Sequence, residues 1–235
     1  MGPQTINRYS RQIAVAEIGS KGQQKLSEAA VIIVGCGALG SMVAMQLAGA
    51  GVGRIGIADY DNVDISNLQR QFFFSTSQAG EPKAELLAQR INDLNPDIIV
   101  DIVKVFVNKS KAKELFRGYD FVVDATDNPD SKRMTGEVSK ELGKACCIGG
   151  VRDFSGQVMT FLSDDPRFEE YFGEAGGEGF LPCSLGGVMG PAAALCASLQ
   201  ASETIKFITG AGSLLSGAIL SFNLLDDSFS RLTLS

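Results

Sequence analysis

The chain has 235 residues, of which 45% are hydrophobic and 20% are charged, and its formal net charge at pH 7 is −6. This composition is that of a globular protein with a sizeable core and excludes a disordered chain. The negative charge gives no support to binding of a nucleic-acid backbone, and the absence of histidine removes the commonest general base and zinc ligand.

The N-terminal residues, Met1–Arg8, lack the basic and then apolar pattern of a signal peptide, so we expect a cytoplasmic protein. The uncharged stretch Ala29–Val52 is long enough to suggest a membrane span. Five glycines divide it, however, into a strand, a tight loop and a helix, so no membrane span is predicted.

The first regular unit begins with a β-branched run, Val31–Val34, followed by a glycine loop, a helix rich in Ala, Leu and Met, and a second strand, Arg54–Asp59. This is a βαβ unit of about thirty residues. Alternating elements follow: helices over Pro82–Leu94, Lys109–Phe116 and Ser131–Leu142, and strands over Ile98–Val103, Phe121–Val123 and Ala145–Ile148. Apolar strands alternating with helices predict an α/β, Rossmann-like fold, whose mostly parallel sheet is covered by helices on both faces.

The last third of the chain has a different pattern. Gln157–Leu162 is typical of a strand that can run antiparallel, and residues 173–187 contain six glycines and one proline. A helix over Met189–Ile208 and strands over Ala218–Leu224 and Ser230–Leu234 follow. We therefore expect a single domain over residues 1–235, with antiparallel strands in its C-terminal part and a mobile crossover segment over residues 163–187.

The loop Gly35–Gly40 matches the pattern G-x-G-x-x-G directly after a strand and before a helix. Its glycines allow backbone N–H groups to approach a phosphate at the positive end of the helix. Asp59 closes the next strand, nineteen residues after Gly40, where a carboxylate can accept hydrogen bonds from ribose hydroxyls. This pattern does not distinguish NAD from ATP.

Three further clusters favour ATP. They are Ser66–Gln71, Glu81–Lys83 and Asp124–Asn128, and the last follows a buried strand. A cation in the first turn of a helix, such as Lys83, opposes the helix dipole unless an anion lies beside it. Because strand ends line the ligand crevice of such a sheet, cations and carboxylates gather at one place, as a triphosphate with Mg²⁺ requires.

These motifs together resemble the ThiF/MoeB/HesA family. The resemblance rests on Arg8–Gln12, the glycine loop, Asp59 with Asp61, Ser66–Gln71, Gly80–Lys83, Ala125–Asn128, Gly187–Pro191, Ser198–Ala201 and Glu203–Lys206. It covers nearly the whole chain, with the motifs in family order. It implies a homodimer that uses MgATP to adenylate the C-terminal glycine of a small ubiquitin-fold sulfur-carrier protein.

The resemblance also implies roles for individual residues. The backbone of Gly37 and Ala38 would hold phosphate, Asp59 the ribose, Asn67, Arg70 and Lys83 the triphosphate, and Asp127 the Mg²⁺, with Asn128 beside it in the nucleotide site. Arg11 would reach the ATP of the partner subunit. Many relatives bind zinc through two C-x-x-C pairs; both pairs are missing here, so no zinc is expected.

The five cysteines include no C-x-x-C pair, and their number is odd, which argues against a disulfide framework. Cys183 lies in the crossover segment, where the resemblance implies a thiol that can join the activated carrier covalently; an incidental thiol is the alternative. Cys146 and Cys147 are expected on opposite faces of a buried strand, and Cys196 in the middle of a helix, all in the core.

The leading hypothesis is therefore an adenylyltransferase for the sulfur carrier of thiamine (thiazole) biosynthesis. One alternative is the same chemistry on the molybdopterin-synthase carrier. A second alternative, an NAD(P)-dependent oxidoreductase, leaves Arg70, Lys83 and Asp127 without a role. The third is a binding module without catalysis, against which the presence of every expected catalytic residue type argues.

Overall fold

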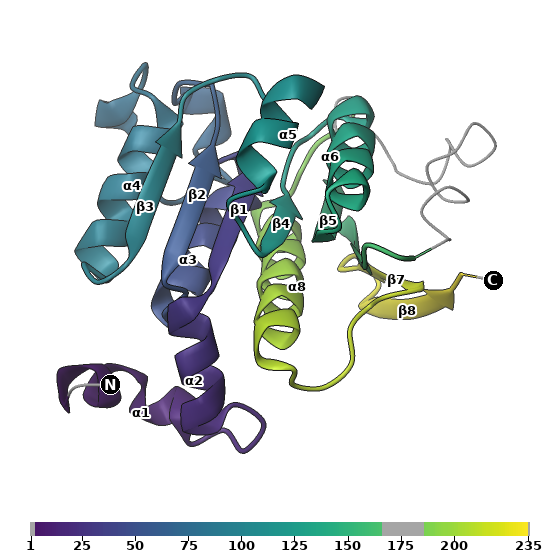
Figure 1. The fold of residues 1–235 in the computed structure, drawn as a ribbon. Coiled ribbons are helices and arrows are strands. Elements are labelled where there is room, and N and C mark those ends of the chain that lie inside the picture. Colours follow the sequence, from purple (N-terminus) through teal and green to yellow (C-terminus); the bar gives the residue numbers. More distant parts are fainter. Residues whose placement is uncertain (1–2, 166–185, 235) are drawn as a thin grey trace.

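The computed structural model describes residues 3–165 and 186–234 (Figure 1). The eight strands of these residues belong to one sheet, in the order β3-β2-β1-β4-β5-β6-β7-β8. The strands are β1 (Ala30–Val34), β2 (Arg54–Ala58), β3 (Ile99–Val103), β4 (Phe121–Asp124), β5 (Ala145–Arg152), β6 (Ser155–Phe161), β7 (Ala218–Asn223) and β8 (Ser228–Thr233). The first five pair in parallel, and β6, β7 and β8 pair antiparallel. The predicted Rossmann-like α/β fold is confirmed.

Helices cover both faces of the parallel part of the sheet. The helices of the described residues are α1 (Pro3–Ile13), α2 (Gly19–Glu28), α3 (Gly40–Ala50), α4 (Lys83–Leu94), α5 (Lys109–Phe116), α6 (Pro129–Glu141) and α8 (Gly190–Thr209). The helices α3, α4 and α8 pack into one hydrophobic cluster, and α5 and α6 into the other (Figure 1). Every helix in the described part of the chain is too short or too polar to span a lipid bilayer.

The strand sequences show why two cores form. Val31 and Ile33 of β1 belong to one cluster and Ile32 and Val34 to the other, because successive side chains of a strand point to opposite faces. A strand buried on both faces therefore needs an uninterrupted apolar run. The cysteines of β5 follow the same rule, with Cys147 in the first cluster and Cys146 in the second. Cys196 lies in the first cluster, so all three are core residues as predicted.

One strand extends beyond its predicted end. We expect the fifth strand to stop at Ile148, but β5 continues through two glycines to Arg152 by pairing with β6. The glycines are accommodated by close packing: a Cβ on Gly149 would lie 2.5 Å from Cδ of Gln200 on α8. The strand therefore tolerates glycine here because a buried side chain occupies the space.

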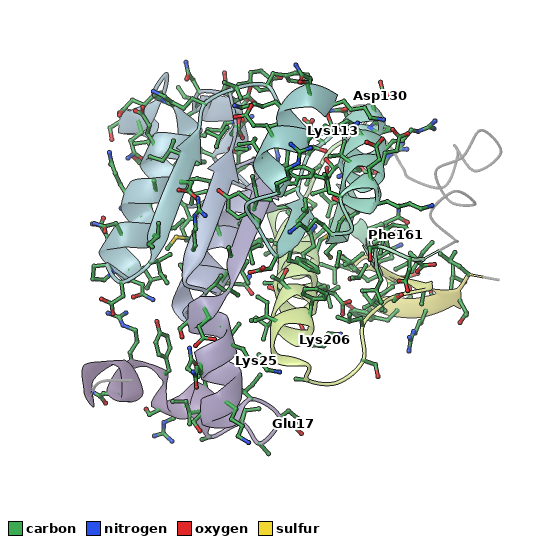
Figure 2. All side chains as sticks on the ribbon, viewed as in Figure 1. Glu17, Lys25, Lys113, Asp130, Phe161 and Lys206 are labelled. Atoms are coloured by element: carbon green, nitrogen blue, oxygen red, sulfur yellow. The ribbon has the colours of Figure 1, made fainter. Side chains whose placement is uncertain are left out.

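Parallel pairing places the carboxyl ends of β1, β2, β4 and β5 at one edge of the sheet. Figure 2 shows Asp130, in the first turn of α6, at this edge, and Glu17 and Lys25 at the opposite end of the molecule. The helices α1 and α2 therefore lie at the far edge from the strand ends.

Candidate functional site

A cavity of about 490 Å³ lies at the carboxyl ends of β1, β2 and β4. It gathers all the residues that the sequence analysis assigned to nucleotide binding within one chain: Gly37, Ala38, Asp59, Asn67, Arg70, Lys83, Asp127 and Asn128. These residues come from five separate stretches of the sequence. The topology alone brings them together, because each stretch follows a parallel strand or begins a helix at this edge.

The glycine loop between β1 and α3 packs tightly against the end of β4. Gly35 has a φ of +93°, and a Cβ on it would lie 2.9 Å from the carbonyl oxygen of Ala125. A Cβ on Gly40 would lie 1.8 Å from the carbonyl oxygen of Gly35. No described side chain caps the start of α3. The N–H of Ser41 donates to the carbonyl of Gly37, but the N–H of Gly40 has no hydrogen-bond partner among the described residues, so it is available to an anion in the cavity.

Asp59 joins the glycine loop to the end of β2. Its Oδ2 accepts a hydrogen bond of 2.6 Å from the backbone N–H of Cys36, and its Oδ1 accepts one of 2.7 Å from that of Asp61. Burial raises the pKa of Asp59, and the two backbone hydrogen bonds and nearby Lys83 oppose this rise. Each oxygen keeps a further lone pair, so the carboxylate can still accept hydrogen bonds from ligand hydroxyls.

The two cations lie on neighbouring walls of the cavity. Lys83 is the first residue of α4, its side chain is only 5% exposed, and its Nζ lies 3.2 Å from Oδ2 of Asp61. Arg70 is half-buried and donates from Nη1 to the carbonyl of Ser66 over 3.3 Å. The expected anion beside Lys83 is thus supplied by Asp61, a contact that the sequence analysis did not identify.

Gln71 is a further cavity residue to which the sequence analysis gave no role. It is buried, and its side-chain Nε2 lies 3.6 Å from where a Cβ on Gly37 would stand. Its buried Oε1 has no hydrogen-bond partner among the residues that the structure describes. A buried unpaired amide oxygen is costly, so a polar ligand in this cavity fits the residues present.

The third cluster, at the end of β4, forms a short turn into α6. Asp127 is exposed on this turn and lines the cavity. Asn128 also lines it, and its Oδ1 caps α6 by accepting a hydrogen bond of 2.8 Å from the N–H of Ser131. This cap explains why α6 begins at Pro129 and not at the predicted Ser131.

An apolar wall closes another side of the cavity. Tyr60 and Phe106 pack edge to face, with ring centroids 5.4 Å apart, and Val105 and Val107 line the same wall. The charge of Asp61, with smaller effects of burial and of Asp127 and Asp59, raises the pKa of Tyr60. The cavity therefore combines an apolar wall, suited to a planar base, with cations, carboxylates and free backbone N–H groups.

Two of the predicted site residues are not placed in this cavity. Arg11 is exposed on α1, at the opposite edge of the sheet, and is not part of the described cavity lining (Figure 1). Cys183 lies outside the described residues.

The chain matches the family model described as "ThiF family" over residues 9–235. It is 37% identical to the sulfur carrier protein adenylyltransferase of Thermus thermophilus, over 97% of this chain and 87% of the relative. It is 36% identical to the probable adenylyltransferase/sulfurtransferase MoeZ of Mycobacterium tuberculosis, covering 97% of this chain but only 60% of MoeZ. A crystal structure of Escherichia coli MccB with ATP has a TM-score of 0.82 at 22% identity, over 97% of this chain and 72% of that one, which supports the fold alone.

Proposed function

The chain belongs to the ThiF family, and we propose that it activates the C-terminal glycine carboxylate of a small ubiquitin-fold sulfur-carrier protein. It is an ATP-dependent adenylyltransferase, the activity for which its relatives are named. The reaction transfers AMP from ATP to a carboxylate and releases pyrophosphate.

The proposal rests on the residues that line the cavity described above. Its lining includes two cationic side chains, Lys83 and Arg70, together with the carboxylate of Asp127 and the glycine loop. A triphosphate with its metal ion uses all of these groups, whereas a dinucleotide has only a pyrophosphate and leaves Lys83, Arg70 and Asp127 without a role in binding the ligand. This supports ATP over a nicotinamide cofactor.

The residues of this chain account for each part of the adenylation step. The carrier's carboxylate oxygen attacks the α-phosphorus, a P–O bond forms, and the P–O bond to the leaving pyrophosphate breaks. The carboxylate is itself the nucleophile, so the step needs no general base, which agrees with a chain that contains no histidine. Lys83 and Arg70 stabilise the charge that develops on pyrophosphate, and the first N–H groups of α3 hold phosphate oxygens.

The remaining groups bind and orient the nucleotide. Asp59 would accept hydrogen bonds from the ribose, the wall of Tyr60 and Phe106 would contact the base, and Asn67 would bind the triphosphate. Asp127 would hold Mg²⁺, which neutralises phosphate charge when bound. We expect no structural zinc, because the chain has no C-x-x-C pair.

Two further parts of the proposal concern the assembly and the carrier. Arg11 lies at the opposite edge of the sheet, so it can act on phosphates only in the cavity of a second subunit, and we expect a homodimer. For the carrier, we propose the one that serves thiazole formation, because the resemblance associates a crossover cysteine such as Cys183 with ThiF-like members. The molybdopterin-synthase carrier is the competing substrate.

The proposal is tested by ATP–pyrophosphate exchange with purified carriers of both types. We expect exchange that depends on a carrier ending in glycine and is lost when the terminal glycine is removed, with the thiazole carrier preferred. Binding of NAD(H) or NADP(H) is measured in parallel. Tight dinucleotide binding without carrier-dependent exchange would support the oxidoreductase, and exchange only with the molybdopterin-synthase carrier would overturn the choice of carrier.

A further inference from the structure

A buried lysine–aspartate pair lies directly behind the turn that presents Asp127 to the cavity. Lys132, in the first turn of α6, has a side chain that is 2% exposed, and Asp124, the last residue of β4, is fully buried. Lysine is almost never fully buried unless it is paired, and even in a pair the dehydration of both charges is costly. An apolar pair of similar volume could fill the same space, so stability alone gives no reason for the charges.

The contacts of Lys132 show what the charge is used for. Its Nζ donates to Oδ1 of Asp124 over 3.0 Å, to the carbonyl of Thr126 over 2.6 Å and to the carbonyl of Gly149 over 2.7 Å. Thr126 directly precedes Asp127, and Gly149 lies on the neighbouring strand β5. The ammonium group therefore ties the peptide that leads into Asp127 to two adjacent strands.

The same turn is also held by Asp124 and by its own helix cap. The backbone N–H and Oγ1 of Thr126 donate to Oδ1 of Asp124 over 3.2 and 2.9 Å. After Asp127, Asn128 caps α6 through its side chain. Asp127 thus stands between two fixed residues, which leaves its backbone little freedom even though its side chain is exposed.

A third tie comes from the opposite face of the sheet. Gln200 of α8 donates from Nε2 to the carbonyl of Asp124 over 2.7 Å and to that of Cys147 over 3.4 Å. Because α6 and α8 cover opposite faces, the end of β4 is held from both sides (Figure 1). The position of Asp127 is therefore set by side chains from both faces of the sheet, and Lys132 donates three of these hydrogen bonds.

We propose that Lys132 is a positioning residue for the adenylation reaction, which fixes the turn of residues 125–128 so that Asp127 meets the metal–nucleotide complex in one arrangement. It does not line the cavity, so it acts through Asp127 and touches no substrate. The inference rests on the proposed function. Preorganisation of this kind matters because a displacement of about 1 Å at a catalytic group can lower a rate 10²-fold.

The test removes the ties without leaving a buried charge. Lys132→Met alone would strand the carboxylate of Asp124, so the principal variant is Lys132→Met with Asp124→Asn, which is neutral and keeps an acceptor for Thr126. The control is Lys109→Met, because Lys109 also bridges to α6, through Glu137 and Glu141, but is exposed. Binding of ATP is measured by calorimetry with and without Mg²⁺, and exchange is measured as a function of Mg²⁺ concentration.

We expect the double variant to bind metal-free ATP within about threefold of wild type, because the groups that hold base and ribose are untouched. The Mg²⁺ concentration for half-maximal exchange should rise at least about tenfold and kcat should fall by a similar factor. The control should match wild type in both measurements. A folded double variant with wild-type Mg²⁺ dependence overturns the proposal.

If the double variant does not fold, the Mg²⁺ dependence of exchange is measured for the Thr126→Val variant in its place. Thr126 is half-buried on the loop, and this change removes one hydroxyl tie of the same turn. A smaller shift of the same kind in Mg²⁺ dependence supports the proposal, and an unchanged dependence overturns it. The calorimetric measurements need no carrier protein, so they test Lys132 even if the proposed substrate is wrong. A wild-type enzyme that binds MgATP but shows exchange with no carrier would refute the proposed substrate only.

Discussion

Replacing Lys83 with methionine tests the triphosphate site most directly. The change keeps the apolar stem of a side chain that is 5% exposed and removes only the ammonium group. We expect the rate of ATP–pyrophosphate exchange to fall about 10²-fold or more, because the variant loses a fixed positive charge at the position where pyrophosphate develops negative charge.

The expected fall in the exchange rate follows from the location of the charge that Lys83 carries. At an effective dielectric constant of about 20 and a separation of about 4 Å, two unit charges interact by about 4 kcal/mol. Removal of one fixed donor to a developing anion costs about 2.7–4 kcal/mol in enzymes where it has been measured, which is roughly 10²–10³ in kcat. Arg70 remains in the cavity and partly compensates, so the lower end of this range is expected.

Folding should be affected much less than catalysis. The partner of Lys83, Asp61, is 49% exposed, so their ion pair contributes about 1 kcal/mol or less. For a domain of this size that corresponds to a change in Tm of less than about 4 °C. Thermal unfolding of the variant checks this, because a large drop in Tm would mean that lost activity reflects lost structure.

A second lysine provides the matched control. Lys104 is exposed, pairs with Glu85 on α4 and does not belong to the described cavity lining. Lys104→Met should leave exchange unchanged, whereas Lys83→Met should not. If Lys83→Met folds normally and retains exchange within about threefold of wild type, then Lys83 does not bind the leaving phosphates, and the assignment of the cavity to a triphosphate is wrong.

Two further predictions concern the partner subunit and the crossover segment. Arg11→Ala and Asp127→Ala should each be inactive. An equal mixture with exchanged subunits should recover about a quarter of wild-type activity, because half of the dimers are hybrids and each hybrid has one intact site of two. Inactive mixtures in which hybrids demonstrably form would contradict action of Arg11 in the partner's site. Cys183→Ser should keep pyrophosphate exchange within about threefold of wild type, because adenylation needs no thiol, but should lose any covalent adduct with the carrier on non-reducing gels. Loss of exchange in Cys183→Ser would refute this separation of the two steps.

The sequence was sufficient to predict the fold and the location of the cavity. The uninterrupted apolar run Val31–Val34 and the helix that follows the glycine loop are local signals, and parallel pairing then places the carboxyl ends of the parallel strands at the same edge. Asp59 and Asp127 follow strands and Lys83 begins a helix, so their positions in sequence determine their positions at this edge. Their chemical roles remain proposals, but their convergence followed from topology alone.

Burial of polar side chains could not be predicted in the same way. Lys132 lies in a polar stretch beside Arg133, and nothing local distinguishes the two. Only the pairing of β4 with β5 creates the buried place where a cation meets the carbonyls of Thr126 and Gly149. Gln71 is a similar case, because its burial depends on how the loop after β2 folds over Gly37. Contacts between distant segments determine both, so no local pattern reports them.

Two buried lysines have different parts in the proposed binding of a polyanion by an acidic chain. With a net charge of −6 the long-range field opposes ATP, so attraction must come from cations fixed at short range. Lys83 is held by Asp61 at the cavity and Lys132 by Asp124 behind it, and each is already oriented before a nucleotide arrives. Such preorganised charges need no reorganisation during the reaction, and they act in a site where water screens them little. In the proposed mechanism, Lys83 therefore binds the phosphates directly, while Lys132 keeps the turn of Asp127 in place for the metal.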